Sequence, residues 1–225
     1  MGYTLNKKNV NVDKRIKISS DSLSDVYVIN RGIALRVYKS NIDKSLVLSE
    51  QDCDYLSGLR SDRILLPKKI LYKNNTYAGY SYRLLNNNMK KDKIIATDID
   101  DFISDIEMLE EDIDFLSKKG VMLDGITPRN VVYSDGLYLT DVSQFKVVDV
   151  DEFNYRELRK LNDYQIQLLL ESMITSELSK EKVMKSKISD LITLMEDRDD
   201  SIKQSKYYEK LFDYSDNIRQ FVKKI

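Results

Sequence analysis

Two polar residues near the middle of the chain are the best candidates for chemistry. Asn130 ends a loop that follows a long helical pattern, and Asp141 follows a short apolar run farther along. A strand–turn–strand segment between them would bring an amide oxygen and a carboxylate together, which suits a hard, oxygen-ligated cation such as Mg²⁺ carrying phosphates. The alternative interpretation is that Asn130 only caps a turn and Asp141 only terminates a strand.

The composition excludes several other kinds of catalysis. The 225 residues include no His and a single Cys, which excludes imidazole bases, Ser-His-Asp triads, His-ligated metals and intramolecular disulfides. The 36 Lys and Arg nearly balance 37 Asp and Glu, so the chain resembles neither a nucleic-acid-binding arm nor an acidic tail. Any catalysis has to rely on carboxylates, cationic side chains, hydroxyls or a carboxylate-bound cation.

The chain carries no sign of export or membrane insertion. The first residues lack an apolar signal core, and no window approaches the ~18 to 20 apolar residues of a membrane span. We therefore expect a cytoplasmic protein that has neither a membrane nor a nucleic acid as its partner.

The first part of the chain has the patterns of strands around one helix. Alternating apolar residues indicate an antiparallel meander over residues 15–39, and two further strands over 64–72 and 76–85. Residues 43–59 have helical spacing. The polar, aperiodic stretch 86–93 is either a linker between two units or a surface loop within one.

The second part is predicted to be mainly helical. A stripe of apolar residues with a 3.6-residue period predicts an amphipathic helix over 99–116, and the chain after about residue 157 also has a helical pattern. Residues 131–139 have the pattern of a hairpin with an Asp-Gly turn. The predicted fold class is α+β, with a β-rich unit over 1–88 and a helical unit over 89–225.

The order and spacing of these segments resemble the protein kinase-like superfamily. Residues 115–130, FLSKKGVMLDGITPRN, align without gaps with the kinase run Y-L-H-S-K-G-I-V-H-R-D-L-K-P-E-N. Asp141 then falls at the Asp-Phe-Gly motif, residues 18–27 overlay the glycine-rich phosphate loop, and residues 33–36 overlay V-A-I-K. The resemblance spans about residues 16–175. It implies one kinase-like domain with a two-lobed fold, a small β-rich N-lobe with one helix and a mainly helical C-lobe.

By this resemblance, ATP and Mg²⁺ would bind between the lobes. Asn130 and Asp141 would hold the metal, and Arg36, in place of the usual Lys, would neutralise phosphate charge. Asp124 would orient the acceptor hydroxyl. The other residues that the resemblance places around the nucleotide are Ile18, Ser19, Ser24, Val26, Ala34, Leu84, Leu85 and Val132, with the adenine at a hinge over residues 84–88.

Further side chains gain expected positions from the same resemblance. Strand alternation puts Ala34 and Arg36 on one face, with Lys39 pointing the other way. Asp52, in the helix over 43–59, is the expected acidic partner of Arg36. Residues 162–164 would open the helix that carries a buried Asp in the family.

The departures from the family pattern leave two functions open. Ser19, Asp21 and Ser24 replace the three phosphate-loop glycines, and Gly125 stands where the acceptor-orienting Asp belongs, with Asp124 one position earlier. One hypothesis is a divergent kinase that transfers phosphate from ATP to a hydroxyl of a protein or small molecule. The alternative is a catalytically impaired pseudokinase, which serves as a nucleotide-binding or protein-interaction scaffold.

Overall fold

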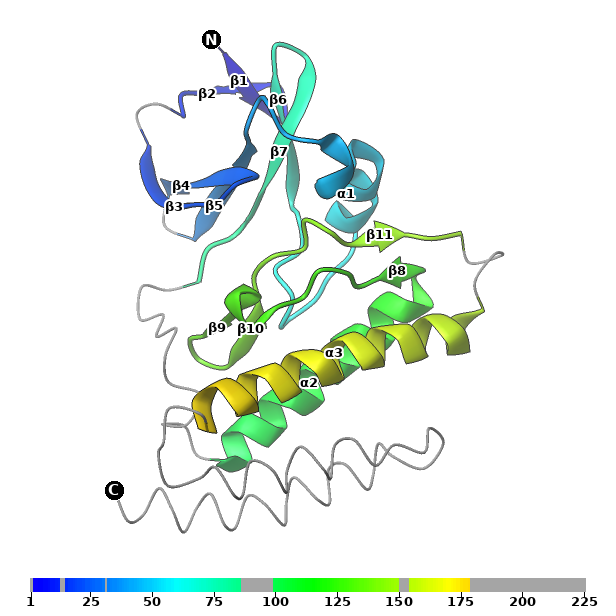
Figure 1. Ribbon diagram of the computed structural model, residues 1–225. Coiled ribbons are helices and arrows are strands. Elements are labelled where there is room, and N and C mark those ends of the chain that lie inside the picture. The colour runs from blue at the N-terminus through cyan, green and yellow to red at the C-terminus, as the bar shows by residue number, and fades with distance from the viewer. Residues whose placement is uncertain (1, 13–14, 31, 86–98, 150–153, 179–225) are drawn as a thin grey trace.

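The computed structural model describes residues 2–12, 15–30, 32–85, 99–149 and 154–178. A seven-stranded sheet is the largest element of this part of the chain (Figure 1), with the order β2-β1-β6-β7-β5-β4-β3 and antiparallel pairing between all neighbours. Its strands are β1 (Tyr3–Leu5), β2 (Lys8–Val10), β3 (Ile16–Ser20), β4 (Ser24–Asn30), β5 (Ile33–Tyr38), β6 (Lys69–Lys73) and β7 (Thr76–Arg83).

Three α-helices and two small strand pairs complete the described residues. The helices are α1 (Glu50–Ser57), α2 (Ile99–Lys118) and α3 (Tyr155–Leu178), and two short 3₁₀ turns are η1 (Lys44–Leu46) and η2 (Pro128–Asn130). Strand β8 (Val121–Met122) pairs with β11 (Lys146–Val147), and β9 (Val131–Tyr133) pairs with β10 (Leu137–Leu139).

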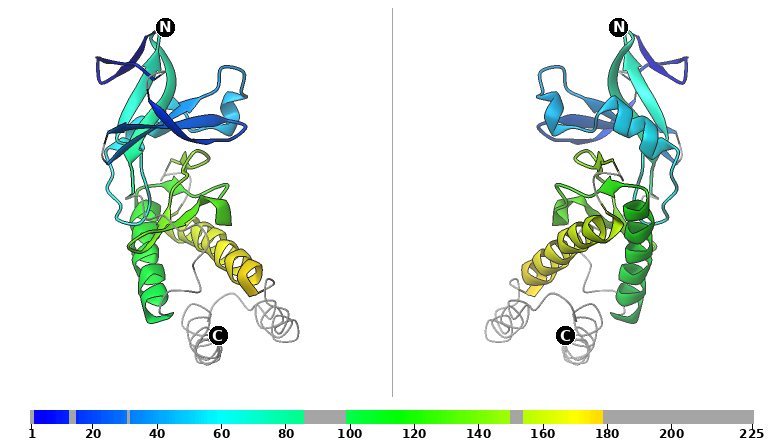
Figure 2. Two further views of the ribbon diagram at one scale, coloured as in Figure 1. Left: turned by 90° about the vertical axis from the view of Figure 1, so that its left-hand side faces the viewer. Right: turned by 90° about the vertical axis from the view of Figure 1, so that its right-hand side faces the viewer.

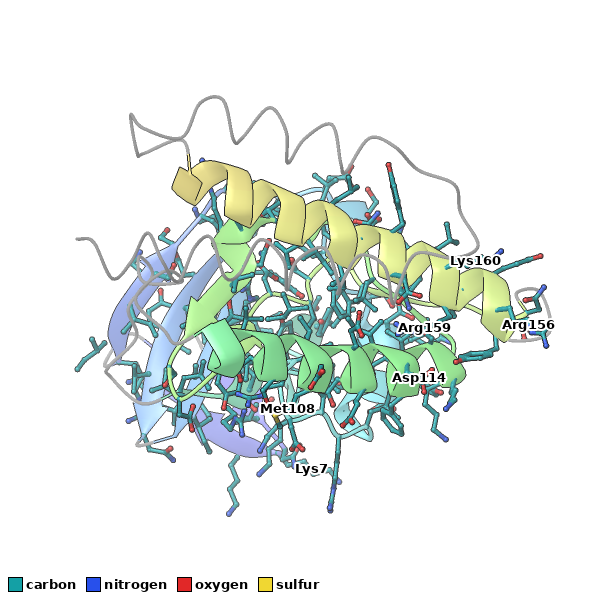
Figure 3. The ribbon with its side chains drawn as sticks, turned by 90° about the horizontal axis from the view of Figure 1, so that it is seen from below. Lys7, Met108, Asp114, Arg156, Arg159 and Lys160 are labelled. Atoms are coloured by element: carbon teal, nitrogen blue, oxygen red, sulfur yellow. The ribbon has the colours of Figure 1, made fainter. Side chains whose placement is uncertain are left out.

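The elements form a stack with the large sheet at one end. Figure 2 shows the seven-stranded sheet and α1 above, the two small strand pairs in the middle, and α2 and α3 below. Seen from below, α2 and α3 run side by side, with Asp114 and Arg159 facing each other across the gap (Figure 3), where their charged groups lie 3.7 Å apart. The small strand pairs therefore lie between the sheet and the helices α2 and α3.

The two faces of the sheet serve different cores. Ala34 belongs to the main core, which also includes residues of α1, α2, α3 and the small strand pairs, whereas Leu35 and Val37 belong to a second core on the opposite face. Because side chains alternate along a strand, Arg36 lies on the same side as Ala34. We call this the inner face. The predicted pairing of Ala34 and Arg36 on one face is confirmed.

A buried asparagine ties α3 to the rest of the main core. The amide nitrogen of Asn162 donates to the Ser117 hydroxyl and to the Val121 carbonyl, both at 2.8 Å, and its oxygen accepts from the Leu123 N–H at 2.8 Å. Asn162 is fully buried. The helix that residues 162–164 were expected to open is α3, which begins earlier, at Tyr155, so that Asn162 lies within it.

The structure contradicts the predicted fold class. We expected an α+β, two-lobed kinase-like fold with a mainly helical second unit, but the described residues are mainly β: a seven-stranded antiparallel sheet with three helices. Between α2 and α3 the chain forms four more strands. Two of these, β9 and β10, form the predicted hairpin, whereas β8 and β11 have two residues each, too few to display the alternation that reveals a strand in a sequence. Residues 179–225, which contributed to the helical prediction, lie outside the described residues.

Individual elements follow the sequence more closely than the fold class does. The predicted meander, the strand over 76–85, the helix after residue 99 and the hairpin over 131–139 are confirmed. The strand expected over 64–72 begins only at Lys69, since Pro67 lacks the N–H that a ladder needs. The proposed boundary at 86–93 lies outside the described residues. Among the helices that the structure describes, none combines the length and apolarity needed to cross a membrane.

Candidate functional site

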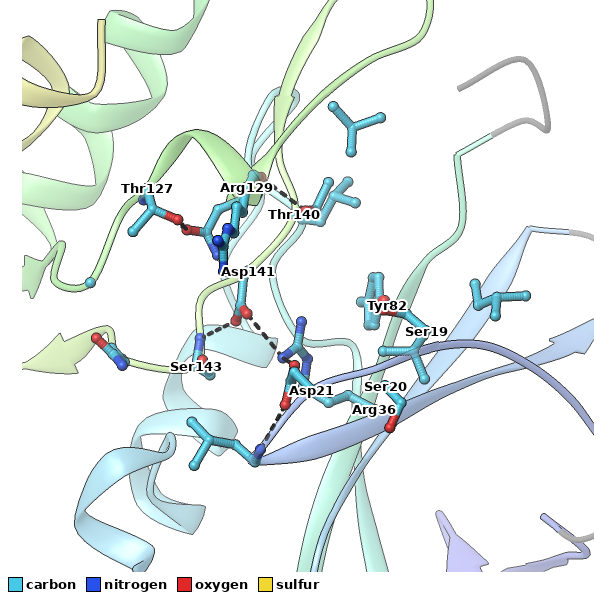
Figure 4. A pocket seen from close by; sticks show the side chains of 18 of the residues that line it. Ser19, Ser20, Asp21, Arg36, Tyr82, Thr127, Arg129, Thr140, Asp141 and Ser143 are labelled. Atoms are coloured by element: carbon cyan, nitrogen blue, oxygen red, sulfur yellow. Dashed lines mark hydrogen bonds and ion pairs between the residues drawn. The ribbon is translucent and has the colours of Figure 1, made fainter. Parts of the chain in front are cut away.

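A pocket of about 800 Å³ opens between the inner face of the sheet and the segments around β8 to β11 (Figure 4). Its walls come from the β3–β4 turn, β5 and the end of β7 on the sheet side, and from residues 124–130 and 140–144 on the other side. This volume is typical of a small-molecule or cofactor site.

Most of the residues that the sequence singled out meet in this pocket. Those that line it are Ile18, Ser19, Val26, Arg36, Leu84, Leu85, Asp124, Asn130, Val132 and Asp141. Ser24 and Ala34 do not line it, because both are fully buried behind the wall.

The sequence analysis missed other wall residues. Tyr82 is the largest of them, and Arg129, Thr140 and Gln144 also line the pocket. Tyr82 lies two positions before Leu84 in an extended segment, so strand alternation could have identified it. The loop residues after β10 carry no such periodic signal.

The charged end of the pocket is organised by Arg36 of β5. Its Nη1 donates to Asp141 Oδ2 at 3.0 Å and to the Ser24 hydroxyl at 3.1 Å, and it lies 3.8 Å from the Asp21 carboxylate. Figure 4 shows Asp21 and Asp141 both approaching this guanidinium. Arg36 therefore links the β3–β4 turn to the segment that follows β10.

Arg36 keeps its charge although it is only 6% exposed. Burial alone would lower its pKa, but the phenol oxygen of Tyr80 and the carboxylate of Asp141 act in the opposite direction and raise the pKa of Arg36 above its ordinary value. Its Nε has no hydrogen-bond partner among the described residues. An acceptor that reached this end of the pocket would meet a permanent cation.

The carboxylate of Asp21 fills the turn between β3 and β4. It accepts the backbone N–H groups of Leu23 at 2.7 Å and Ser24 at 2.6 Å, and the Ser24 hydroxyl at 3.1 Å. About half of the Asp21 side chain is exposed. Hydrogen bonds to the Asp21 carboxylate thus hold this turn in one conformation. A turn built from glycines would be more flexible.

The apolar end of the pocket begins beside Arg36. Its side chains are Ile18, Val26, Leu65, Leu84, Leu85 and Val132, and Val26 is the cross-strand partner of Arg36. Val26, Leu65 and Val132 are also buried members of the main core, so this wall is fixed by the packing of the whole molecule. The pocket therefore has one apolar end and one charged end.

Asn130 and Asp141 do not fit a divalent cation in this arrangement. The Asn130 side-chain oxygen accepts the Thr127 N–H at 2.7 Å and the Thr127 hydroxyl at 2.6 Å, which occupies both of its lone pairs. Asp141 accepts from Arg36 through one oxygen and from the Ser143 N–H at 2.9 Å through the other. Asn130 completes the capping box of η2, whose N-cap is Thr127, so its oxygen has the turn-capping role of the alternative interpretation. Binding of Mg²⁺ stays a prediction.

Asp124 lines the pocket from the loop after β8. One of its oxygens accepts the Gly125 N–H at 2.8 Å, and the other lies 3.4 Å from the ammonium group of Lys146. Nearly half of the Asp124 side chain is exposed. Gly125 has a φ of +64°, a conformation that glycine adopts without strain, so the loop can turn here and present Asp124 to the pocket.

The structure changes the expected partner of Arg36 and gives Lys39 a partner that was not predicted. Asp52 does not pair with Arg36, since its carboxylate faces the Val147 N–H at 3.4 Å and Asp141 is the partner instead. Lys39 lies outside the pocket lining, as expected, but its ammonium group donates to the Asp21 carbonyl. It therefore helps to hold the β3–β4 turn.

Comparison with known proteins assigns no ligand or function to this pocket. No protein-family model and no curated protein matches the chain. The resemblance to the protein kinase-like superfamily therefore stays a prediction.

Proposed function

We propose that the pocket binds a nucleotide of the ATP class. The observation that carries the proposal is its division into an apolar end and an end built around the permanent charge of Arg36. A nucleotide has the same division, with a flat, largely apolar base at one end and phosphates at the other. A volume of about 800 Å³ is large enough for such a ligand.

The proposed orientation follows from the chemistry of the two ends. The base would lie between Val26 on the sheet side and Val132 on the other side, both of which are buried residues of the wall. The ribose would point toward Arg36. In this role the protein acts as a nucleotide-binding module. A protein partner that binds its nucleotide-bound form remains a prediction.

Phosphoryl transfer is a second candidate, favoured by the position of Asp124. Its exposed carboxylate lines the same pocket as Arg36, which suits a group that receives a proton from an acceptor hydroxyl. In that reaction the hydroxyl oxygen bonds to the γ-phosphorus, the bond from the γ-phosphorus to the bridging oxygen breaks, and ADP leaves. Asp124→Asn would abolish transfer from radiolabelled ATP without weakening nucleotide binding.

Two isoleucines of β3 offer a matched test of nucleotide binding. Ile18 lines the pocket and is 46% exposed, whereas Ile16 on the same strand face is 72% exposed and does not line it. Isothermal titration with ATP should show binding to the wild type and to Ile16→Glu, and binding weakened about tenfold or more by Ile18→Glu. Equal affinities for both variants, or no binding to the wild type, would contradict the proposal.

A further inference from the structure

The charged end of the pocket already holds an anion, the carboxylate of Asp21. Two backbone N–H groups, of Leu23 and Ser24, and the Ser24 hydroxyl donate to it. The guanidinium of Arg36 lies 3.8 Å away and donates to the same hydroxyl. Successive backbone amides that converge with a hydroxyl and a cation form the kind of concave donor group that binds phosphate oxygens.

These donors are held in place by the fold. Ser24 is fully buried behind the pocket wall and Arg36 is 6% exposed, so packing holds both side chains in place. Asp21, in contrast, has a side chain that is 48% exposed and can leave toward solvent. The donors are thus the rigid part of the arrangement, and the carboxylate is its replaceable part.

We propose that Asp21 is a specificity-determining residue that occupies the place of a nucleotide phosphate. The inference rests on the proposed nucleotide function and deepens it. Because the carboxylate is tethered beside its donors, a phosphate has to displace an intramolecular competitor, whose effective concentration is high. The pocket then binds the nucleoside part of its ligand, and added phosphates contribute little affinity.

We call the donors of Leu23, Ser24 and Arg36 the phosphate seat. The charges around this seat also favour the proposed role of Asp21. Asp141 already pairs with Arg36 at 3.0 Å, and Asp21 supplies a second carboxylate within 3.8 Å. A phosphate that arrived while Asp21 stayed in place would meet two carboxylates and one guanidinium. Without the charge of Asp21, one carboxylate and one guanidinium remain, so the net negative charge that opposes a phosphate is removed.

The variant Asp21→Asn separates this role from an ordinary turn role. In the free protein an Asn oxygen can accept from the same two N–H groups, so the β3–β4 turn persists. As a neutral acceptor it is weaker than a carboxylate, so a phosphate displaces it more easily. Asp25→Asn is the matched control, because Asp25 lies on the adjacent β4 and does not itself line the pocket. Its carboxylate likewise accepts from a serine hydroxyl, that of Ser20 at 2.6 Å.

The test is a titration series of adenosine, AMP, ADP and ATP against the wild type and both variants. For the wild type and Asp25→Asn, we expect dissociation constants that change by less than about threefold along the series. For Asp21→Asn, adenosine should bind as before and ATP about tenfold tighter or more. A wild type that already gains tenfold from the phosphates, or an Asp21→Asn series that stays flat, would overturn the inference.

Inorganic tripolyphosphate separates the failure of this inference from the failure of the proposed function. It should bind Asp21→Asn and neither the wild type nor Asp25→Asn, and the binding should be lost in Asp21→Asn combined with Arg36→Met. If tripolyphosphate gives these results while no nucleoside binds the wild type or any variant, the phosphate seat is supported and the nucleotide function is contradicted. If tripolyphosphate does not bind Asp21→Asn, the seat itself is refuted.

Discussion

Arg36 and Asp141 are 105 positions apart in the chain, yet their side chains are joined at 3.0 Å. The Arg36 side chain is 7% exposed and that of Asp141 20%, so the two ends of this ion pair are buried to different degrees. The pair connects the inner face of the sheet to the segment after β10 and borders the candidate nucleotide pocket (Figure 4).

This difference in burial predicts that Asp141→Asn and Arg36→Met lower the free energy of unfolding by different amounts. Asp141→Asn leaves a buried guanidinium without its close carboxylate and should lower the free energy of unfolding by about 3 kcal/mol. Arg36→Met leaves Asp141 partly solvated and still bonded to the Ser143 N–H, so about half that loss is expected. Urea unfolding of both variants measures the difference. A larger loss for Arg36→Met would show that the cation is the better solvated partner.

Asn162 is predicted to be the polar residue whose loss most weakens the attachment of α3. Asn162→Leu leaves the Leu123 N–H and the Val121 carbonyl without partners in the core, at about 1–3 kcal/mol for each group. The control is Asn154→Ala, which removes an exposed acceptor of the Glu157 N–H at the start of α3 and should cost about 1 kcal/mol. Similar urea midpoints for the two variants would contradict this role.

Local patterns in the sequence predict much of the structure but not its balance of strands and helices. Alternation along β5 correctly places Ala34 and Arg36 on one face, and the 3.6-residue period correctly identifies α2. Strands β8 and β11 contain two residues each and are stable only because they pair with each other, a tertiary fact that no local pattern contains. The predicted helical unit therefore contains two strands, β8 and β11, in addition to the predicted hairpin.

The candidate site shows the same division between local and tertiary information. The sequence order predicts that Arg36 and Asp141 approach each other, and both line one pocket. It does not predict that Asp141 replaces Asp52 as the partner of Arg36, nor that Thr127 occupies the Asn130 oxygen. Those outcomes depend on side-chain hydrogen bonds that form only once the loops are in place.

Asp163 predicts a pH dependence of stability. Burial raises its pKa to about 6, against the influence of Arg159, with which it forms an ion pair. The folded state therefore binds more protons than the unfolded state between about pH 4 and pH 6, and the free energy of unfolding falls as the pH rises through that window, by at most about 3 kcal/mol.

The variant Asp163→Asn removes this contribution. The difference in free energy of unfolding between the wild type and Asp163→Asn, measured by urea titration at several pH values, should change between pH 4 and pH 6 and be constant above about pH 7. Other carboxylates titrate in both proteins and cancel in the difference. A difference that stays constant from pH 4 to pH 7 would contradict the raised pKa.

The hydrogen bonds of Asn130 predict weak binding of divalent cations to the protein alone. Because Thr127 occupies the Asn130 oxygen and Arg36 borders Asp141, Mn²⁺ titrated as a probe of Mg²⁺ sites should show no binding tighter than about 1 mM. Electron paramagnetic resonance of free Mn²⁺ gives the measurement. A stoichiometric site that Asp141→Asn abolishes would instead support the metal role that the sequence predicts.

A crystal structure with a non-hydrolysable ATP analogue tests the nucleotide pocket most directly. The account predicts the base between Val26 and Val132 and the ribose directed toward Arg36, with Asp21 still bonded to the Leu23 and Ser24 N–H groups in the wild type. In Asp21→Asn, a phosphate oxygen should lie within hydrogen-bond distance of those two N–H groups. An analogue bound elsewhere, or an empty pocket at saturating concentration, would contradict the account.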